Sequence, residues 1–147
     1  MSMKLAKDNT ATPDFYSENG AGTDPIRAAV TLDGTGGVKT AVSTDPIYVI
    51  FSDDGQNIAS ITGHDDNPSG PLVELVSEET GINWELSADG TTWTGLNALT
   101  LADQDVSSGD TNVRIYARCN VANDGSVAVD NYVDAQFRTK CKQNPPA

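Results

Sequence analysis

The chain has 147 residues and a mass of 15.5 kDa, which is the size of a single domain with one hydrophobic core. Apolar residues make up 37% of it and there are 13 glycines, a composition that disfavours helical bulk and favours many turns around a thin β core. The net charge of −12 argues against direct binding to nucleic acid or to anionic membranes, because such binding requires clustered lysine and arginine.

Residues 1–24 are polar and lack the apolar periodicity of a strand or a helix. We expect an extended N-terminal arm that becomes ordered only on a partner, with Phe15 and Tyr16 as its large anchors. This region has no apolar run as long as an export signal, and no later segment approaches the roughly 20 apolar residues of a membrane span. We therefore expect synthesis in the cytoplasm and no membrane contact.

The next segments alternate apolar and polar residues in the manner of half-buried strands. Ile26 to Leu32 form the first predicted strand and Ile47 to Phe51 the second, and each is entered through Thr-Asp-Pro. Leu72 to Val76 also fit a helical face, but Glu78 and Glu79 would then face the negative end of the helix dipole. We therefore predict a strand there.

Ile82, Trp84 and Leu86 alternate as a further strand and lead into the sequence Ser-Ala-Asp-Gly-Thr-Thr-Trp, residues 87–93. This run resembles the Asp-box of sialidase-type propellers, although one residue between Asp and Gly is missing. A propeller is excluded, because no blade-sized repeat follows. The resemblance implies only a local hairpin turn, held by hydrogen bonds of Ser87 and Asp89 with Trp93 packed beneath it.

The clearest alternation lies near the C-terminus, in Val113 to Cys119 and again in Val133 to Phe137. We predict that these two segments form one antiparallel hairpin closed by residues 120–130. Residues 142–147 are mostly polar, include two prolines next to the last residue and are expected to form a flexible tail. The sequence thus predicts an all-β, Ig-like antiparallel β-sandwich of about seven to nine strands over residues 25–141.

The two cysteines, Cys119 and Cys141, would lie at opposite ends of that hairpin, too far apart for a disulfide. We expect free thiols.

Charge is unevenly distributed along the sequence. From Thr40 to Val113 there is no lysine or arginine, yet this stretch contains thirteen aspartates and glutamates. The predicted hairpin would gather basic and aromatic residues on its polar face, a composition enriched where proteins touch each other. With the arm anchors, the predicted partner-binding residues are Phe15, Tyr16, Arg114, Tyr116, Arg118, Tyr132, Arg138 and Lys140.

No residue cluster indicates a reaction. His64 is the single histidine and lies among loop-forming residues, and the two cysteines lack the paired spacing of a zinc site. We therefore expect no enzyme activity, no metal ligands and no cofactor. Several acidic loops leave a calcium site open as an alternative, formed by loops that converge in space.

Taken together, the arm, the sandwich and the acidic balance resemble the small decoration or cement proteins of tailed-bacteriophage heads. Trp84 to Trp93 and Val113 to Arg118 are similar to stretches of phage Ig-like domains. The resemblance implies a virion structural protein on the capsid surface, a homotrimer that binds the major capsid protein and stabilises the shell.

An alternative is a carbohydrate-binding or adhesin module, in which Trp84 or Trp93 stacks on sugar rings and acidic loops hold calcium.

Overall fold

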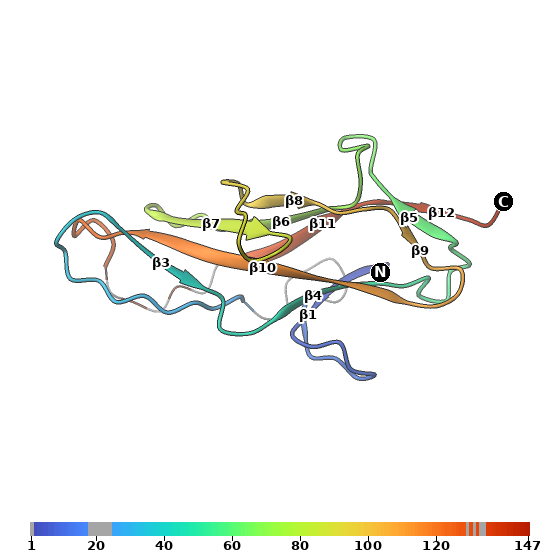
Figure 1. Cartoon of the computed structure of the whole chain (residues 1–147), viewed down its shortest axis with the longest axis horizontal. Coiled ribbons are helices and arrows are strands. Elements are labelled where there is room, and N and C mark those ends of the chain that lie inside the picture. Colours follow the sequence, from blue (N-terminus) through green and yellow to red (C-terminus); the bar gives the residue numbers. More distant parts are fainter. Residues whose placement is uncertain (1, 18–24, 129, 131, 133–134) are drawn as a thin grey trace.

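The computed structural model describes residues 2–17, 25–128, 130, 132 and 135–147, and in these residues all regular structure is β (Figure 1). None of the described segments is a helix that could cross a membrane. The strands are β1 (Met3–Ala6), β2 (Phe15–Ser17), β3 (Val38–Val42), β4 (Ile47–Phe51), β5 (Ser60–Thr62), β6 (Leu72–Val76), β7 (Ile82–Ser87), β8 (Ala98–Thr100), β9 (Gln104–Asp105), β10 (Thr111–Ala122), β11 (Gln136–Lys140) and β12 (Lys142–Asn144).

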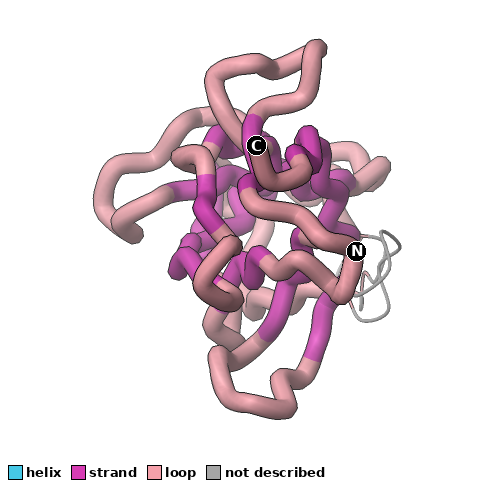
Figure 2. Tube along the Cα trace, turned by 90° about the vertical axis from the view of Figure 1, so that its right-hand side faces the viewer, coloured by secondary structure: helices cyan, strands magenta, loops and turns pink. Residues whose placement is uncertain are grey.

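These strands form one large and two small antiparallel sheets. The large sheet has the order β2-β1-β4-β10-β3. Its sixth strand, β7, pairs with β10 along the edge opposite β3. The small sheets have the orders β11-β6-β8 and β12-β5-β9. The predicted all-β class and antiparallel sandwich are confirmed. Figure 2 shows the strands gathered in the middle of the molecule with loops projecting around them.

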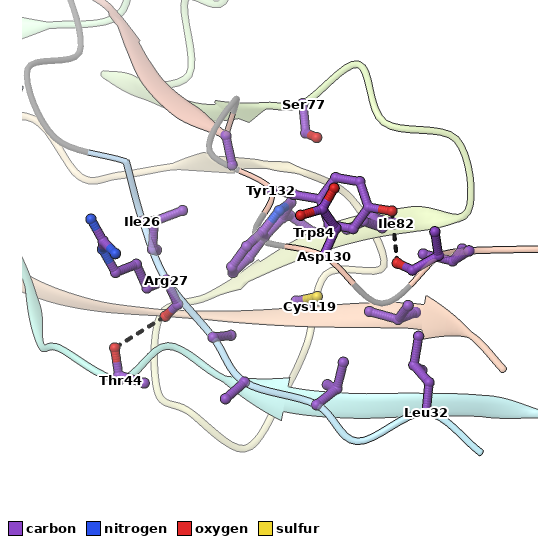
Figure 3. Close-up of a pocket in the computed structure, with 17 residues that line it drawn as sticks. Ile26, Arg27, Leu32, Thr44, Ser77, Ile82, Trp84, Cys119, Asp130 and Tyr132 are labelled. Atoms are coloured by element: carbon purple, nitrogen blue, oxygen red, sulfur yellow. Dashed lines mark hydrogen bonds between the residues drawn. The ribbon is translucent and has the colours of Figure 1, made fainter.

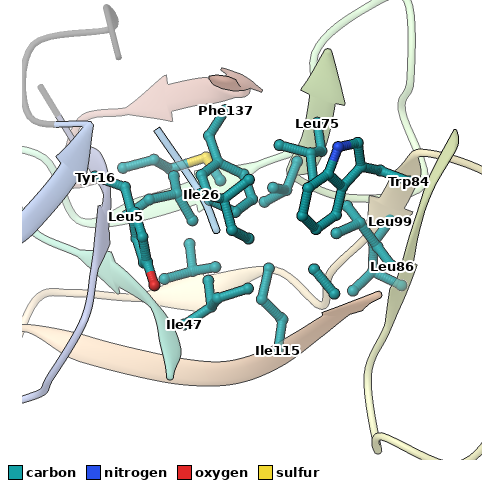
Figure 4. Packing of buried hydrophobic residues seen from close by; sticks show 14 of the residues in the cluster. Leu5, Tyr16, Ile26, Ile47, Leu75, Trp84, Leu86, Leu99, Ile115 and Phe137 are labelled. Carbon is teal, nitrogen blue, oxygen red and sulfur yellow. The ribbon is translucent and has the colours of Figure 1, made fainter. Parts of the chain in front are cut away.

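The core lies between the large sheet and the β11-β6-β8 sheet (Figure 4). The large sheet contributes the buried Ile115 and Ala117 of β10, and the facing sheet contributes the buried Leu75 of β6 and Phe137 of β11. Because side chains alternate along a strand, the residues between them point away from the core, outward from each sheet. The predicted strands at β4, β6, β7 and β10 are confirmed, and in each of them alternate apolar residues are buried.

The N-terminal segment contradicts the predicted free arm wherever it is described. β1 lies between β2 and β4, and Met3 and Leu5 are 2% and 0% exposed. Tyr16 is 2% exposed, its ring lies 5.5 Å from that of Phe137, and its hydroxyl donates to the Pro46 carbonyl. Burial of these side chains makes residues 3–6 and 15–17 part of the sandwich, so the domain does not begin at residue 25. Residues 18–24 of the predicted arm lie outside the described residues.

The predicted strand from Ile26 to Leu32 keeps its alternation but belongs to no sheet. Ile26 is buried, while Ala28, Val30 and Leu32 are partly buried against the core. The amide of Thr44 donates to the Arg27 carbonyl at 2.9 Å. The segment is therefore an extended connection over the core, positioned by its apolar side chains.

The predicted C-terminal hairpin is wrong. β10 pairs with β3, β4 and β7, whereas β11 pairs with β6 in the facing sheet. The loop after β10 is long enough to cross between the sheets, and Phe137 fills the far side of the core. Val133 lies outside the described residues. The predicted flexible tail is also partly wrong, because β12 pairs with β5 and the Ala59 amide donates to the Asn144 carbonyl.

Candidate protein-binding face

The predicted basic face is divided between opposite sides of the sandwich. Arg114, Tyr116 and Arg118 lie on β10 and point outward from the large sheet, since Ile115 and its alternate neighbours are buried. Arg138 is exposed on β11, outward from the facing sheet. The two groups of arginines therefore cannot contact one flat partner together.

Other predicted contact residues are engaged within the chain. Lys140 Nζ lies 3.2 Å from Asp66 Oδ2. Phe15 is half-buried with Lys4 Nζ 5.8 Å from its ring centroid, and Tyr16 is buried. Tyr132 donates a hydrogen bond to the Ala128 carbonyl. Of the predicted set, Arg114, Tyr116 and Arg118 remain together on one outward surface.

This surface, which we call the β10 face, gains residues from neighbouring strands. The register places Tyr48 of β4 opposite Arg114, and both Val42 of β3 and Glu85 of β7 opposite Arg118. We define the face by its aromatic, arginine and exposed apolar members: Val38, Val42, Tyr48, Trp93, Arg114, Tyr116 and Arg118.

Cation–π contacts order the centre of the β10 face. The Arg114 guanidinium lies 4.6 Å from the Tyr116 ring centroid and 5.4 Å from that of Tyr48. The Arg118 guanidinium lies 4.5 Å from the Trp93 ring. Val38 and Val42 of β3 are 63% and 62% exposed, which is unusual for large apolar residues of a strand. The β10 face thus combines aromatic rings and arginines that hold one another in place with valine side chains that are exposed to solvent.

The turn after β7, residues 87–93, positions Trp93 and packs against Tyr116. It is held by hydrogen bonds of Ser87 and Asp89, as its sequence predicts. Ser87 donates to the Thr92 carbonyl at 2.6 Å, and one carboxylate oxygen of Asp89 accepts from the amides of Thr91 and Thr92. These amide bonds hold the pKa of Asp89 far below its usual range. Gly90, at φ 78°, lies so close to the Tyr116 ring that a side chain would crowd it.

Glu85 neutralises one of the two arginines. Its carboxylate accepts from Arg118 Nε at 2.7 Å and from Asn120 Nδ2 at 2.6 Å, and its side chain is only 12% exposed. The bond from Arg118, followed by that from Asn120, lowers the pKa of Glu85. The charge of Arg118 is therefore already paired with Glu85 within the chain.

An apolar pocket of about 430 Å³ lies on the inner side of β10 (Figure 3). It was not predictable from the sequence, because its walls come from segments far apart in the chain: the extended connection, β7, β10 and the described residues Val127, Ala128, Asp130, Tyr132 and Ala135. Cys119 opens onto it, and burial raises the pKa of this thiol, which makes it a poor nucleophile. Its lining includes Ile26, Val30, Ile82, Trp84, Val121 and Tyr132.

The remaining candidates for chemistry are separate from one another. His64 is partly exposed, and its Nδ1 accepts from the Asp66 amide at 3.1 Å. Within the described ranges, no three His, Cys, Asp or Glu side chains come together as metal ligands. Cys119 and Cys141 are free thiols, as predicted, although the hairpin from which that prediction was argued does not form.

Comparison with known proteins adds no family, because no family model and no curated protein matches this sequence.

Replacing Glu85 with glutamine is expected to destabilise the protein at neutral pH and to flatten its pH dependence in acid. Folding lowers the pKa of Glu85, so the ionised carboxylate contributes to the free energy of unfolding. This contribution is complete above the unfolded pKa of about 4.3 and is lost as pH falls through the folded pKa. Urea unfolding of both proteins at a series of pH values measures this. A difference between wild type and Glu85→Gln that stays constant down to about pH 2 would contradict it.

Proposed function

We propose that the protein is a decoration protein of a bacteriophage capsid, which attaches to the major capsid protein through the β10 face and stabilises the shell. The observation that carries this proposal is the composition of the face. Two tyrosines, a tryptophan and two arginines lie together beside two exposed valines. Tyrosine, tryptophan and arginine dominate the centres of protein contacts, and exposed apolar residues gain free energy when a partner covers them.

The sandwich suits a protein that acts by attachment. A rigid sheet presents these side chains without the entropy cost of ordering a loop. Binding to the assembled lattice, and not to free subunits, stabilises the lattice by mass action. A homotrimer, as expected from the likeness to decoration proteins, would multiply the contacts per particle. Its mass in solution, measured by light scattering, tests that part of the proposal separately.

Replacing Val42 with serine is expected to weaken attachment about tenfold, because an interface would lose the burial of one valine. The measurement is co-sedimentation of the purified protein with DNA-free heads of a phage whose genome encodes this chain. Gln136→Ser is the matched control, since Gln136 is exposed on β11 in the facing sheet. Equal binding by Val42→Ser and wild type, or binding lost equally in the control, would contradict attachment through the β10 face.

The carbohydrate-binding alternative has less support. Trp84 is 9% exposed and belongs to the core, and the Trp93 ring is in contact with Arg118. Stacking on a sugar requires a free aromatic face. Calcium-dependent retention of the protein on a glycan array, lost in Trp93→Ala, would favour this alternative over capsid attachment.

A further inference from the structure

Two arginines on the same side of β10 differ in their electrostatic state. Arg118 has the Glu85 carboxylate at 2.7 Å. Arg114 is four residues away on the same strand, and no carboxylate oxygen of the described residues lies within 4.0 Å of it. The chain has a net charge of −12, and yet the acidic side chains described leave the charge of Arg114 on the β10 face unpaired.

The surroundings of Arg114 hold its guanidinium group in place. Its Nε donates to the Ile115 carbonyl at 3.2 Å, and the rings of Tyr48 and Tyr116 lie at 5.4 and 4.6 Å. The nearest outward residues across the strand pair are therefore aromatic and not acidic. An arginine fixed by rings loses little side-chain entropy on binding, and its two remaining nitrogens match the two oxygens of a carboxylate.

We infer that Arg114, held by Tyr48 and Tyr116, is the receptor for an acidic side chain of the protein that docks on the β10 face. This inference rests on the proposed attachment through that face and names the chemistry of the contact. Charge complementarity selects the occupant: the face has one arginine neutralised internally by Glu85 and one left for a partner. Once a partner covers these half-buried rings, the ion pair lies in a less polar environment, which strengthens it.

The first experiment does not require the capsid. The blocked dipeptide acetyl-Glu-Glu-amide is titrated into ¹⁵N-labelled protein at low salt, and the side-chain Nε–H signals of the arginines are followed by NMR. We expect the Arg114 signal to shift further than that of Arg138, which is exposed on the opposite side. Equal shifts of both signals would overturn the inference, whatever the protein does with heads.

The second experiment measures binding to the phage heads described above. Arg114→Gln is expected to bind about tenfold more weakly, as for loss of a charge-assisted hydrogen bond. The affinity of Arg114→Lys should lie between those of wild type and Arg114→Gln, because lysine keeps the charge but lacks the planar guanidinium. Arg138→Gln is the matched control and should bind as wild type. Urea unfolding verifies that each variant is folded.

The outcomes separate the two proposals. If wild type and Arg114→Gln bind heads equally, the inference about Arg114 is overturned and attachment through the β10 face stands. If wild type fails to bind heads while the dipeptide still shifts the Arg114 signal selectively, capsid attachment is overturned and the carboxylate site stands.

Discussion

Deletion of residues 2–17 is expected to unfold the protein, because these residues include an internal strand of the large sheet. β1 pairs with β2 on one side and with β4 on the other. Without it, β4 would expose a free edge, and the core would lose Met3, Leu5 and Tyr16. Removing one buried leucine side chain typically costs about 2–5 kcal/mol, and a domain of this size is stable by only about 5–15 kcal/mol. The loss of three buried side chains and a strand exceeds that reserve.

Near-ultraviolet circular dichroism and urea unfolding measure the effect. We expect the shortened protein to lose its aromatic signal and its cooperative transition. Leu5→Ala is the milder variant, which should remain folded with a lower urea midpoint. Removal of residues 145–147, which follow the last strand, is the control and should leave the midpoint unchanged. A shortened protein with the wild-type midpoint would restore the free-arm interpretation of the sequence.

The strands that could be predicted from the sequence are those with sustained alternation. In β10, four alternate residues from Ile115 to Val121 are buried, and this period specifies both a strand and its inner face. The turn at residues 87–93 was also predictable, because Ser87 and Asp89 make bonds within their own loop. In both cases the deciding interactions are local or periodic.

The pairing of strands was not predictable in the same way. β1 has four residues, too few to show a period, and its partner β4 lies more than forty residues later in the chain. β11 alternates as expected around Phe137, but alternation does not say which sheet receives the strand. The predicted hairpin used the shortest connection, whereas burial of Phe137 against Tyr16 and the core determines the outcome.

The candidate site was half predictable for the same reason. Arg114, Tyr116 and Arg118 were identified because they alternate along one strand. Tyr48 and Trp93 were missed, because each reaches the β10 face through the β4 pairing or the turn after β7. The division of the arginines between opposite faces follows from the sheet assignment of β11. Attachment is therefore proposed through the β10 face, and not through one basic face shared by β10 and β11.

Replacing Asn123 with alanine is expected to destabilise the protein by about 2–3 kcal/mol, because a buried side chain would lose all its hydrogen bonds. Asn123 is 1% exposed and follows β10. Its Oδ1 accepts from the amides of Asp33 and Gly34, and its Nδ2 donates to Asp33 Oδ1 and the Gly36 carbonyl. These four bonds fasten the glycine-rich loop that leads into β3, and β3 contributes the exposed valines of the β10 face.

Urea unfolding at neutral pH measures the loss, and NMR titration of Asp33 provides an independent measurement. The bond from Asn123 is the largest cause of the lowered pKa of Asp33, so the Asp33 pKa should rise toward its usual value in Asn123→Ala. Asn123→Asp is the informative comparison: it keeps the acceptor oxygens but places a second carboxylate against Asp33. It should be less stable than wild type at pH 7 and recover part of the difference in acid, where one of the two carboxyl groups becomes protonated. An unchanged midpoint in Asn123→Ala, with an unchanged Asp33 pKa, would show that the loop is held by its backbone bonds alone, among them Gly36 N–H to the Asn123 carbonyl at 2.7 Å.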